Sequence, residues 1–270
     1  MKGLLVFDSS DVLSFSNIVT TLRAAGCVFA EEEAHLFISA AQTQSDLSLM
    51  IDKRRSGLPV EQILGWAEFC GLRVIIETGV FIPRYKTEFL VNQAASLSHD
   101  DSLILDLCCG SGAVGLAMLS LLPQATLYAA DIDPVAVRCA SQNLNPFGGR
   151  VFEGDLFEPL PKELKGRIEV LVANAPYVPT EAIEMMPRES RLFERHISLD
   201  GGEDGLEVQR RIASEAPLWL APGGHLLVET SEHQAASAAN IFLTSGLTPR
   251  IMRSDDFDAT VVIGEKSKRR

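Results

Sequence analysis

The second half of the chain alternates short apolar runs with amphipathic stretches, and this alternation limits the possible folds more than any other feature. From Ser102 onward, each run is long enough for one strand, and most of the stretches between them carry apolar residues at helical spacing. The expected strands cover residues 102–109, 125–132, 150–157, 168–177 and 225–231, followed by two strand-like segments within 249–266. A long loop is expected over 178–204 and a helix that ends in a turn over 206–224. The pattern predicts a doubly wound α/β sheet with an antiparallel hairpin at its C-terminal edge.

The first part of the chain has a different pattern. Asp11 to Gly65 shows helical spacing without a strand, which predicts three or four short helices. Residues 68–83 are rich in β-branched and aromatic side chains with a turn signal at Thr78-Gly79, which predicts a hairpin. The helical part either recognises a partner or caps the larger domain. We expect an N-terminal helical, substrate-recognition domain (1–66), a β-hairpin linker (67–83) and a catalytic domain (84–270).

Composition restricts the classes of function. Of 270 residues, 46% are hydrophobic and 22% are charged, as in ordinary globular proteins. The net charge of −12 opposes binding to a long phosphate backbone, so nucleic acid is not the expected partner. No apolar run approaches the ~20 residues that span a bilayer, and the five cysteines lack metal-binding spacing. We expect a cytoplasmic monomer with reduced thiols, no metal and no membrane contact.

The expected strand over 168–177 ends abruptly at Asn174, which is followed by Ala175-Pro176-Tyr177. In an open α/β sheet, ligands bind beyond the carboxyl ends of the strands. The Asn174 side-chain oxygen and the Ala175 carbonyl can accept the two N–H bonds of an –NH2 group, and Tyr177 offers a flat face beside them. The alternative is a simple Asn-Xaa-Pro turn that closes a strand.

A second candidate site follows the first two strands of the sheet. The glycine-containing turn at 106–112 permits close backbone approach at the start of a helix, although any tight strand-to-helix turn has similar residues. Asp131 ends the next strand, where a carboxylate can bind ribose hydroxyls, while Asp133 is better suited to cap the following helix. Asp155 can meet a nucleobase edge with Leu156 and Phe157 as apolar walls, or can belong to a turn. Without a phosphate-binding loop, these residues favour S-adenosylmethionine over NAD.

Several motifs together resemble a known family. Class I S-adenosylmethionine-dependent methyltransferases with an [N/D]PP[Y/F] motif are similar to this chain at ILDLCCGSGAVGLA, AADIDPVAVRCASQNL, GDLFEPLP and VLVANAPYV. The HemK/PrmC protein-(glutamine-N5) methyltransferases are similar, more narrowly, at LPVEQILGWAEF, VFIPRYKTEFLV, LDGGEDGLEVQRRI and LAPGGHLLVETSEHQ. The resemblance covers most of the chain. It implies a Rossmann-like, mostly parallel sheet of seven strands, preceded by a helical domain and a hairpin linker.

The resemblance also implies roles for particular residues. S-adenosylmethionine, which leaves as S-adenosylhomocysteine, would be bound by Asp106, Cys108, Cys109, Gly110, Ser111, Gly112, Asp131, Asp155, Leu156 and Asn174. The substrate amide would be held by the catalytic segment Asn174, Ala175, Pro176 and Tyr177, with Arg84 and Glu88 of the PRxxTE motif nearby. Alternatively, Arg84 and Glu88 simply pair on a helix surface.

The chain departs from the family pattern at one catalytic position. Ala175 stands where the family has the first proline of NPPY, so the backbone carbonyl is retained while φ is less constrained. The Cys-Cys pair and NAPY together resemble a PrmC-related side branch of the family. The expected activity is methylation of a glutamine side-chain nitrogen in a protein such as a peptide-chain release factor. The alternatives are methylation of an exocyclic amine on a nucleobase or small molecule, and a non-catalytic S-adenosylmethionine-binding protein.

Overall fold

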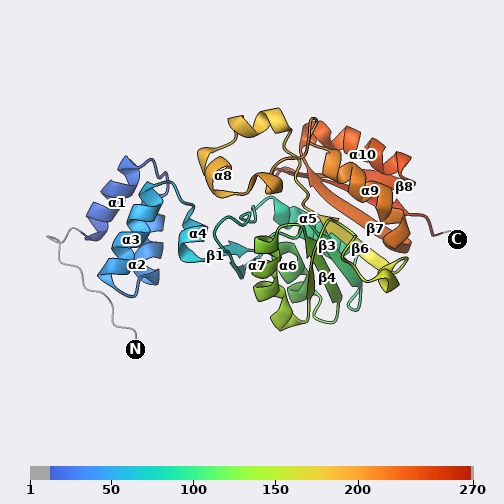
Figure 1. Ribbon diagram of the computed structural model, residues 1–270, viewed down its shortest axis with the longest axis horizontal. Helices are drawn as coiled ribbons and strands as arrows, with labels where there is room; N and C mark the ends of the chain where they lie inside the picture. The colour runs from blue at the N-terminus through green and yellow to red at the C-terminus, as the bar shows by residue number, and fades with distance from the viewer. Residues whose placement is uncertain (1–12, 269–270) are drawn as a thin grey trace.

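A computed structural model describes residues 13–268, and its N-terminal part is helical, as the sequence predicts (Figure 1). The helices are α1 (Phe15–Ala24), α2 (Ala30–Ala40), α3 (Gln44–Arg55) and α4 (Val60–Leu64). Thr43 and Asp46 form a reciprocal capping box that begins α3. Buried apolar residues from α1, α2 and α3, among them Ile18, Phe37 and Leu47, form a core separate from the sheet. Asp11 and Val12 of the predicted helical segment lie outside the described residues.

A short hairpin follows these helices, with its turn at a different place from the one predicted. Strands β1 (Trp66–Phe69) and β2 (Leu72–Ile75) pair in antiparallel fashion. Cys70 (φ 50°) and Gly71 (φ 70°) form the two-residue turn between them. The prediction of a turn at Thr78-Gly79 is therefore wrong for the hairpin. Gly79 (φ 86°) lies beyond β2, in the stretch that leads to α5 (Thr87–Ser96).

The described residues contain a sheet of seven strands in the order β5-β4-β3-β6-β7-β9-β8. Their bounds are β3 (Leu103–Leu107), β4 (Thr126–Asp131), β5 (Arg150–Glu153), β6 (Ile168–Ala173), β7 (Leu220–Thr230), β8 (Leu247–Ser254) and β9 (Ala259–Lys266). β9 lies antiparallel between β7 and β8, whereas the other neighbouring strands run parallel. This arrangement confirms the predicted mostly parallel sheet with a C-terminal antiparallel hairpin.

Helices cover both faces of the sheet, because neighbouring residues of each strand point to opposite sides (Figure 1). Ile104 packs in one core with side chains of α5, α6 (Ala113–Leu121) and α7 (Pro134–Leu144). Leu105 packs in the opposite core with side chains of α9 (Glu207–Trp219) and α10 (Ala235–Thr244). The predicted helix over 206–224 ends earlier than expected. Its last residues belong to β7, where a Cβ on Gly224 would lie 2.7 Å from the Ile168 carbonyl oxygen.

Residues 178–206, here called the covering segment, contain short helical turns, although a long loop was expected over 178–204. These are η3 (Thr180–Met185), α8 (Arg188–Phe193) and η4 (His196–Ser198). The segment meets the N-terminal helices where Arg54 Nη1 lies 2.6 Å from Glu189 Oε1. The Gln62 amide also donates to the Phe193 carbonyl at 3.0 Å. The covering segment therefore connects the helical part of the chain with the sheet.

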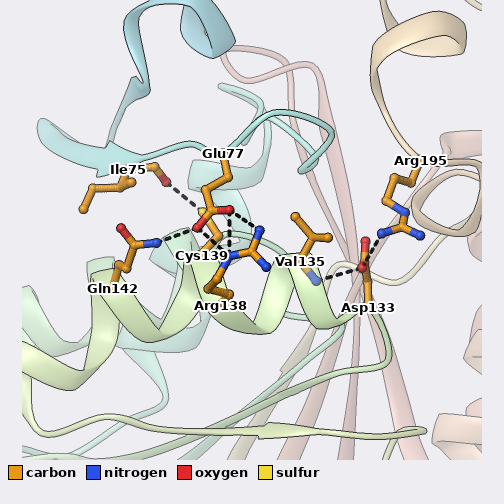
Figure 2. Close-up of polar contacts among 8 residues, drawn as sticks. All are labelled: Ile75, Glu77, Asp133, Val135, Arg138, Cys139, Gln142 and Arg195. Atoms are coloured by element: carbon orange, nitrogen blue, oxygen red, sulfur yellow. Dashed lines mark hydrogen bonds and ion pairs between the residues drawn. The ribbon is translucent and has the colours of Figure 1, made fainter.

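Helix α7 binds the residues that follow β2 and one residue of the covering segment (Figure 2). Asp133 caps its N-terminus by accepting from the Val135 N–H at 2.9 Å, as predicted for that residue, and also accepts from Arg195 at 2.8 Å. Arg138 and Gln142 donate to Glu77, which lies just after β2. These contacts hold the hairpin and the covering segment against one helix.

Asn143 makes the buried part of this attachment. Its side-chain oxygen accepts from the Ile75 N–H at 2.9 Å. Its side-chain nitrogen donates to the Ile75 carbonyl at 3.0 Å and to the Ser111 carbonyl at 2.8 Å. One carboxamide therefore joins the hairpin to the turn that follows β3.

Replacing Asn143 with alanine should lower the free energy of unfolding by about 2 to 3 kcal/mol, because it removes three hydrogen bonds made by a buried side chain. Urea unfolding followed by circular dichroism measures this change. The matched control is Asn240→Ala, at an exposed position of α10, which should change stability by less than about 0.5 kcal/mol. Equal stability of the two variants would contradict the role assigned to Asn143.

Candidate active site

A cavity of about 860 Å³ lies at the carboxyl ends of β3, β4 and β6, beneath the covering segment. This is where ligands bind in open α/β sheets. Most of the residues singled out in the sequence line it: Arg84, Asp106, Cys108, Cys109, Gly110, Ser111, Asp131, Asp155, Leu156, Asn174, Ala175, Pro176 and Tyr177. The fold thus brings the two predicted half-sites, after β3 and β4 and after β6, into one space.

Gly112 and Glu88 are not among the cavity-lining residues. Gly112 has φ 77°, and a Cβ there would lie 2.9 Å from the Leu144 side chain, so this glycine permits close packing of α6 against α7. The Glu88 carboxylate accepts from the Cys70 N–H at 2.8 Å in the turn of the hairpin. The structure gives Gly112 a packing role and Glu88 a role in the hairpin turn, and their contacts with cofactor and substrate stay predictions.

Arg84 lies before α5 begins, so it cannot form a helix-surface pair with Glu88. Its guanidinium instead pairs with Glu194 of the covering segment, and the Glu194 side chain is buried. Glu194 also accepts from the Ile82 N–H at 3.3 Å. Burial raises the pKa of the Glu194 carboxyl, while Arg84 opposes that rise. Arg84 therefore holds the covering segment over the cavity that it also lines.

The turn after β3 is held by Asp131. The Gly110 N–H donates to Asp131 Oδ2 at 2.8 Å, and the Asp133 N–H donates to Oδ1 at 2.9 Å. Gly110 has φ 55°, the conformation that glycine adopts most readily. Each carboxylate oxygen keeps a further lone pair, so Asp131 can still accept from a ligand hydroxyl in the cavity. Burial raises the pKa of Asp131.

Asp106, in β3, stabilises the start of the helix that follows the same turn. It is buried, and its Oδ2 accepts from the Gly115 N–H at 3.0 Å in the first turn of α6. Burial raises the pKa of the Asp106 carboxyl from 3.8 to about 7, and the negative charge of Asp131 adds to the rise. The two neighbouring thiols, Cys108 and Cys109, also have a pKa raised by burial and by nearby acids, so they remain protonated.

Asp155 and Leu156 form the wall after β5. Asp155 Oδ2 accepts from Arg211 of α9 at 2.7 Å, and both residues line the cavity. Leu156 is buried with φ 50° and provides an apolar surface. The cavity thus offers a carboxylate at Asp131, which lies between the glycine turn after β3 and the apolar wall at Leu156 after β5. This set of groups fits a nucleoside ligand and contains no cradle for a pyrophosphate.

The opposite end of the cavity is formed by Asn174–Tyr177. Asn174 Nδ2 donates to the buried Thr87 hydroxyl at 3.3 Å. Among the described residues no donor reaches Asn174 Oδ1, which leaves this oxygen available to a ligand. The Tyr177 hydroxyl donates to Glu229 Oε1 at 3.1 Å and accepts from Lys86. The site therefore presents a free carboxamide oxygen beside an aromatic ring with a fixed hydroxyl.

The sequence interpretation missed four residues that shape the site: Lys86, Thr87, Arg211 and Glu229. Thr87 was placed in a helix but given no function, although it belongs to the PRxxTE motif. Glu229 is the last residue but one of β7, and Asn174 directly follows β6; this position near a strand end was the available signal. Lys86 and Arg211 carry no signal in the sequence, because their partners lie 91 and 56 residues away.

Comparison with known proteins agrees with this geometry. The family model "Methyltransferase small domain" matches residues 72–193. Release factor glutamine methyltransferase of Geobacter sulfurreducens is 36% identical over 217 residues, which are 80% of this chain and 75% of that protein. Its counterpart in Synechocystis is 32% identical over 227 residues, covering 80% and 76%. A methyltransferase structure from Pyrococcus furiosus has a TM-score of 0.57 at 14% identity, with 83% of this chain and 99% of that chain covered.

The fold is that of a class I S-adenosylmethionine-dependent methyltransferase, and S-adenosylmethionine is its cofactor. The seven-stranded, mostly parallel sheet, counted over residues 13–268, confirms the expected fold class. The chain belongs to the release factor glutamine methyltransferase family, the HemK/PrmC group that its motifs resemble. Within residues 13–268, no helix has the length and apolar character required to cross a membrane.

The raised pKa of Asp106 gives the stability of the protein a definite pH dependence. Between pH 3.8 and about 7, the folded chain holds a proton at Asp106 that the unfolded chain has released. The contribution of this group to the free energy of unfolding is therefore highest at acid pH and falls as pH rises to about 7. Asp106→Asn should flatten this fall, since asparagine can still accept from the Gly115 N–H.

Urea unfolding at intervals from about pH 4 to about pH 8 measures the effect. The matched control is Asp101→Asn, whose side chain is exposed and should leave the slope unchanged. Parallel profiles for Asp106→Asn and the unsubstituted chain would show that Asp106 is already ionised in the folded protein at acid pH.

Proposed function

We propose that this protein transfers a methyl group from S-adenosylmethionine to the side-chain amide nitrogen (N5) of a glutamine in a protein acceptor. A peptide-chain release factor is the acceptor class that the names of its relatives suggest. The observation that carries the proposal is the pair of hydrogen-bond acceptors at Asn174 and Ala175, which line the cavity. They lie beside the turn over residues 108–112 that follows β3, here called the cofactor turn. Two adjacent oxygens of this kind match the two N–H bonds of a primary amide.

The chemistry requires help with a weak nucleophile. An amide nitrogen is unreactive because its lone pair is delocalised into the carbonyl group. Hydrogen bonds from both N–H groups to Asn174 Oδ1 and the Ala175 carbonyl favour a pyramidal nitrogen and stabilise the positive charge that develops on it. S-adenosylmethionine supplies the electrophilic methyl group, which Asp131, Leu156 and the turn containing Gly110 would hold in place.

Tyr177 supports this step without serving as a base. Burial and the neighbouring Glu229 raise the pKa of its phenol, so the hydroxyl stays protonated at neutral pH. Its proton is already donated to Glu229. The ring can therefore pack against the acceptor and exclude water, while the acceptor amide loses its proton after methyl transfer.

The Asn174→Ala variant tests the acceptor pair. It should lower the rate of methyl transfer by about 10²- to 10³-fold, because one oxygen that stabilises the developing charge is removed. The dissociation constant for S-adenosylmethionine, measured by calorimetry, should change less than about threefold. Asn240→Ala in α10 is the control and should transfer normally. Normal transfer by Asn174→Ala would show that the amide is not held there.

Labelling of a cell extract identifies the class of acceptor. The purified enzyme and S-adenosylmethionine with a tritiated methyl group should label material that protease removes and nuclease leaves. The Asn174→Ala variant is the matched control and should give little label. Label that only nuclease removes would instead indicate a nucleobase amine, and no label above the control would indicate a protein that binds S-adenosylmethionine without catalysis.

We further infer that residues 1–66 form an acceptor-recognition domain, with 67–83 as linker and 84–270 as catalytic domain. Support comes from the separate core of α1–α3 and from Pro59 and Glu61, which line the cavity. A glutamine side chain alone offers little area for specific recognition. The proposed setting is a cytoplasmic monomer, which is consistent with five cysteines that are all free.

A further inference from the structure

Two consecutive residues at the start of α5 contact both ends of the acceptor segment Asn174–Tyr177. The Thr87 hydroxyl accepts from Asn174 Nδ2 at 3.3 Å. Lys86 Nζ donates to the Tyr177 hydroxyl and lies 5.1 Å from the centre of its ring. Because α5 is a regular helix packed on the sheet, it provides one rigid support for both contacts.

Glu229 completes the arrangement around the Tyr177 hydroxyl. Its side chain is 2% exposed, and its Oε1 lies 3.1 Å from the Tyr177 hydroxyl and 3.6 Å from Lys86 Nζ. A buried carboxylate is stable only with a partner charge and hydrogen bonds. Lys86 supplies that charge, and Tyr177 supplies the hydrogen bond. The phenol oxygen therefore has both its donor and its acceptor bond inside the protein.

The acceptor segment needs such support because its own backbone is weakly constrained. Ala175 lacks the ring that would restrict φ. Among the described residues no acceptor is hydrogen-bonded to the Ala175 N–H. The Gln234 side chain donates to the Tyr177 carbonyl at 2.9 Å. This hydrogen bond holds the main chain at the end of the segment but does not restrict rotation of the tyrosine ring. Within residues 13–268, the hydrogen bonds to the Tyr177 side chain come from Lys86 and Glu229, and both hold the ring through its hydroxyl.

We propose that Lys86 is a positioning residue for methyl transfer: with Glu229 it fixes the Tyr177 ring, and it thereby compensates for the backbone freedom that Ala175 introduces. This inference rests on the proposed amide methylation. Lys86 lines the cavity but has its ammonium group committed to Tyr177 and Glu229, so it acts on the acceptor through the tyrosine. Side-chain contacts thus supply the rigidity that a proline at position 175 would supply through the backbone.

The first test is kinetic and uses the full chain. Lys86→Met should lower kcat for methyl transfer by about 10- to 100-fold, the loss expected when a reacting group is misplaced by a fraction of an ångström or more. Binding of S-adenosylmethionine should stay within about threefold. Lys86→Arg, which keeps the charge and the donors, should retain most of the rate. The matched control is Lys162→Met, at an exposed position in η2 (Lys162–Leu164), which should leave kcat unchanged.

The second test examines compensation directly. Proline at position 175 would break no hydrogen bond among the described residues, because the Ala175 N–H makes none there, and Ala175 has no positive φ. Ala175→Pro should raise kcat at least about fivefold more in the Lys86→Met chain than in the unsubstituted chain, since only the former lacks the side-chain support. An equal increase in kcat in both chains would show that Lys86 does not compensate for Ala175. An unchanged kcat in Lys86→Met would overturn the positioning role of Lys86.

Loss of Lys86 also leaves the Glu229 charge without its partner, so instability could lower the rate. The variant Lys86→Met with Glu229→Gln removes both charges and keeps an acceptor for the Tyr177 hydroxyl. It should recover the thermal stability of the unsubstituted chain while kcat stays low. Recovery of kcat together with stability would show that Lys86 serves stability alone.

A readout without turnover separates this inference from the proposed function. The chain has three tyrosines, Tyr85, Tyr128 and Tyr177, so ring-13C-tyrosine NMR resolves each one. The Tyr177 signals should broaden or split in Lys86→Met, remain unchanged in Lys162→Met, and sharpen again when Ala175→Pro is added. Unchanged Tyr177 signals in Lys86→Met would overturn the inference even if the enzyme is active. The absence of transfer to any protein, with these NMR changes present, would overturn the proposed function only.

Discussion

The site depends on the parallel pairing of the two central strands, β3 and β6. Leu107 lies opposite Ala173 in this register, so the strands end at the same level of the sheet. The cofactor turn begins directly after β3, and the acceptor segment begins directly after β6. Backbone hydrogen bonds in a buried sheet thus set the distance between methyl donor and acceptor, and the loops need only orient the groups they carry.

The covering segment joins the two halves of the site to the rest of the molecule. Arg195 contacts the cap of α7 at Asp133, Glu194 binds Arg84 before α5, and Glu189 binds Arg54 of the N-terminal helices. These ion pairs connect the turn before α7, the start of α5 and the N-terminal helices through one stretch of chain. If the helical domain recognises the acceptor, as we propose, the acceptor also lies close to the residues that cover the cavity.

Much of this arrangement could be predicted from the sequence, because it depends on local patterns. Strand periodicity located the sheet, and Asn174 at a strand end pointed to the cavity that this residue lines. The turn of the hairpin was misplaced because the positive φ of Cys70 is atypical for cysteine. The PRxxTE motif suggested that Glu88 contacts the substrate, whereas its carboxylate accepts a hydrogen bond from the Cys70 N–H of the hairpin. Lys86 could not be predicted, since its partners come from the ends of other strands.

The central claim is that the acceptor amide is held by two oxygens, Asn174 Oδ1 and the Ala175 carbonyl. A crystal structure of the enzyme with S-adenosylhomocysteine and a glutamine-containing acceptor tests it most directly. The account predicts that the glutamine amide nitrogen lies within about 3.2 Å of both oxygens, with the sulfur of the cofactor product on its open side. A glutamine bound elsewhere, or an amide nitrogen that contacts neither oxygen, would contradict the account.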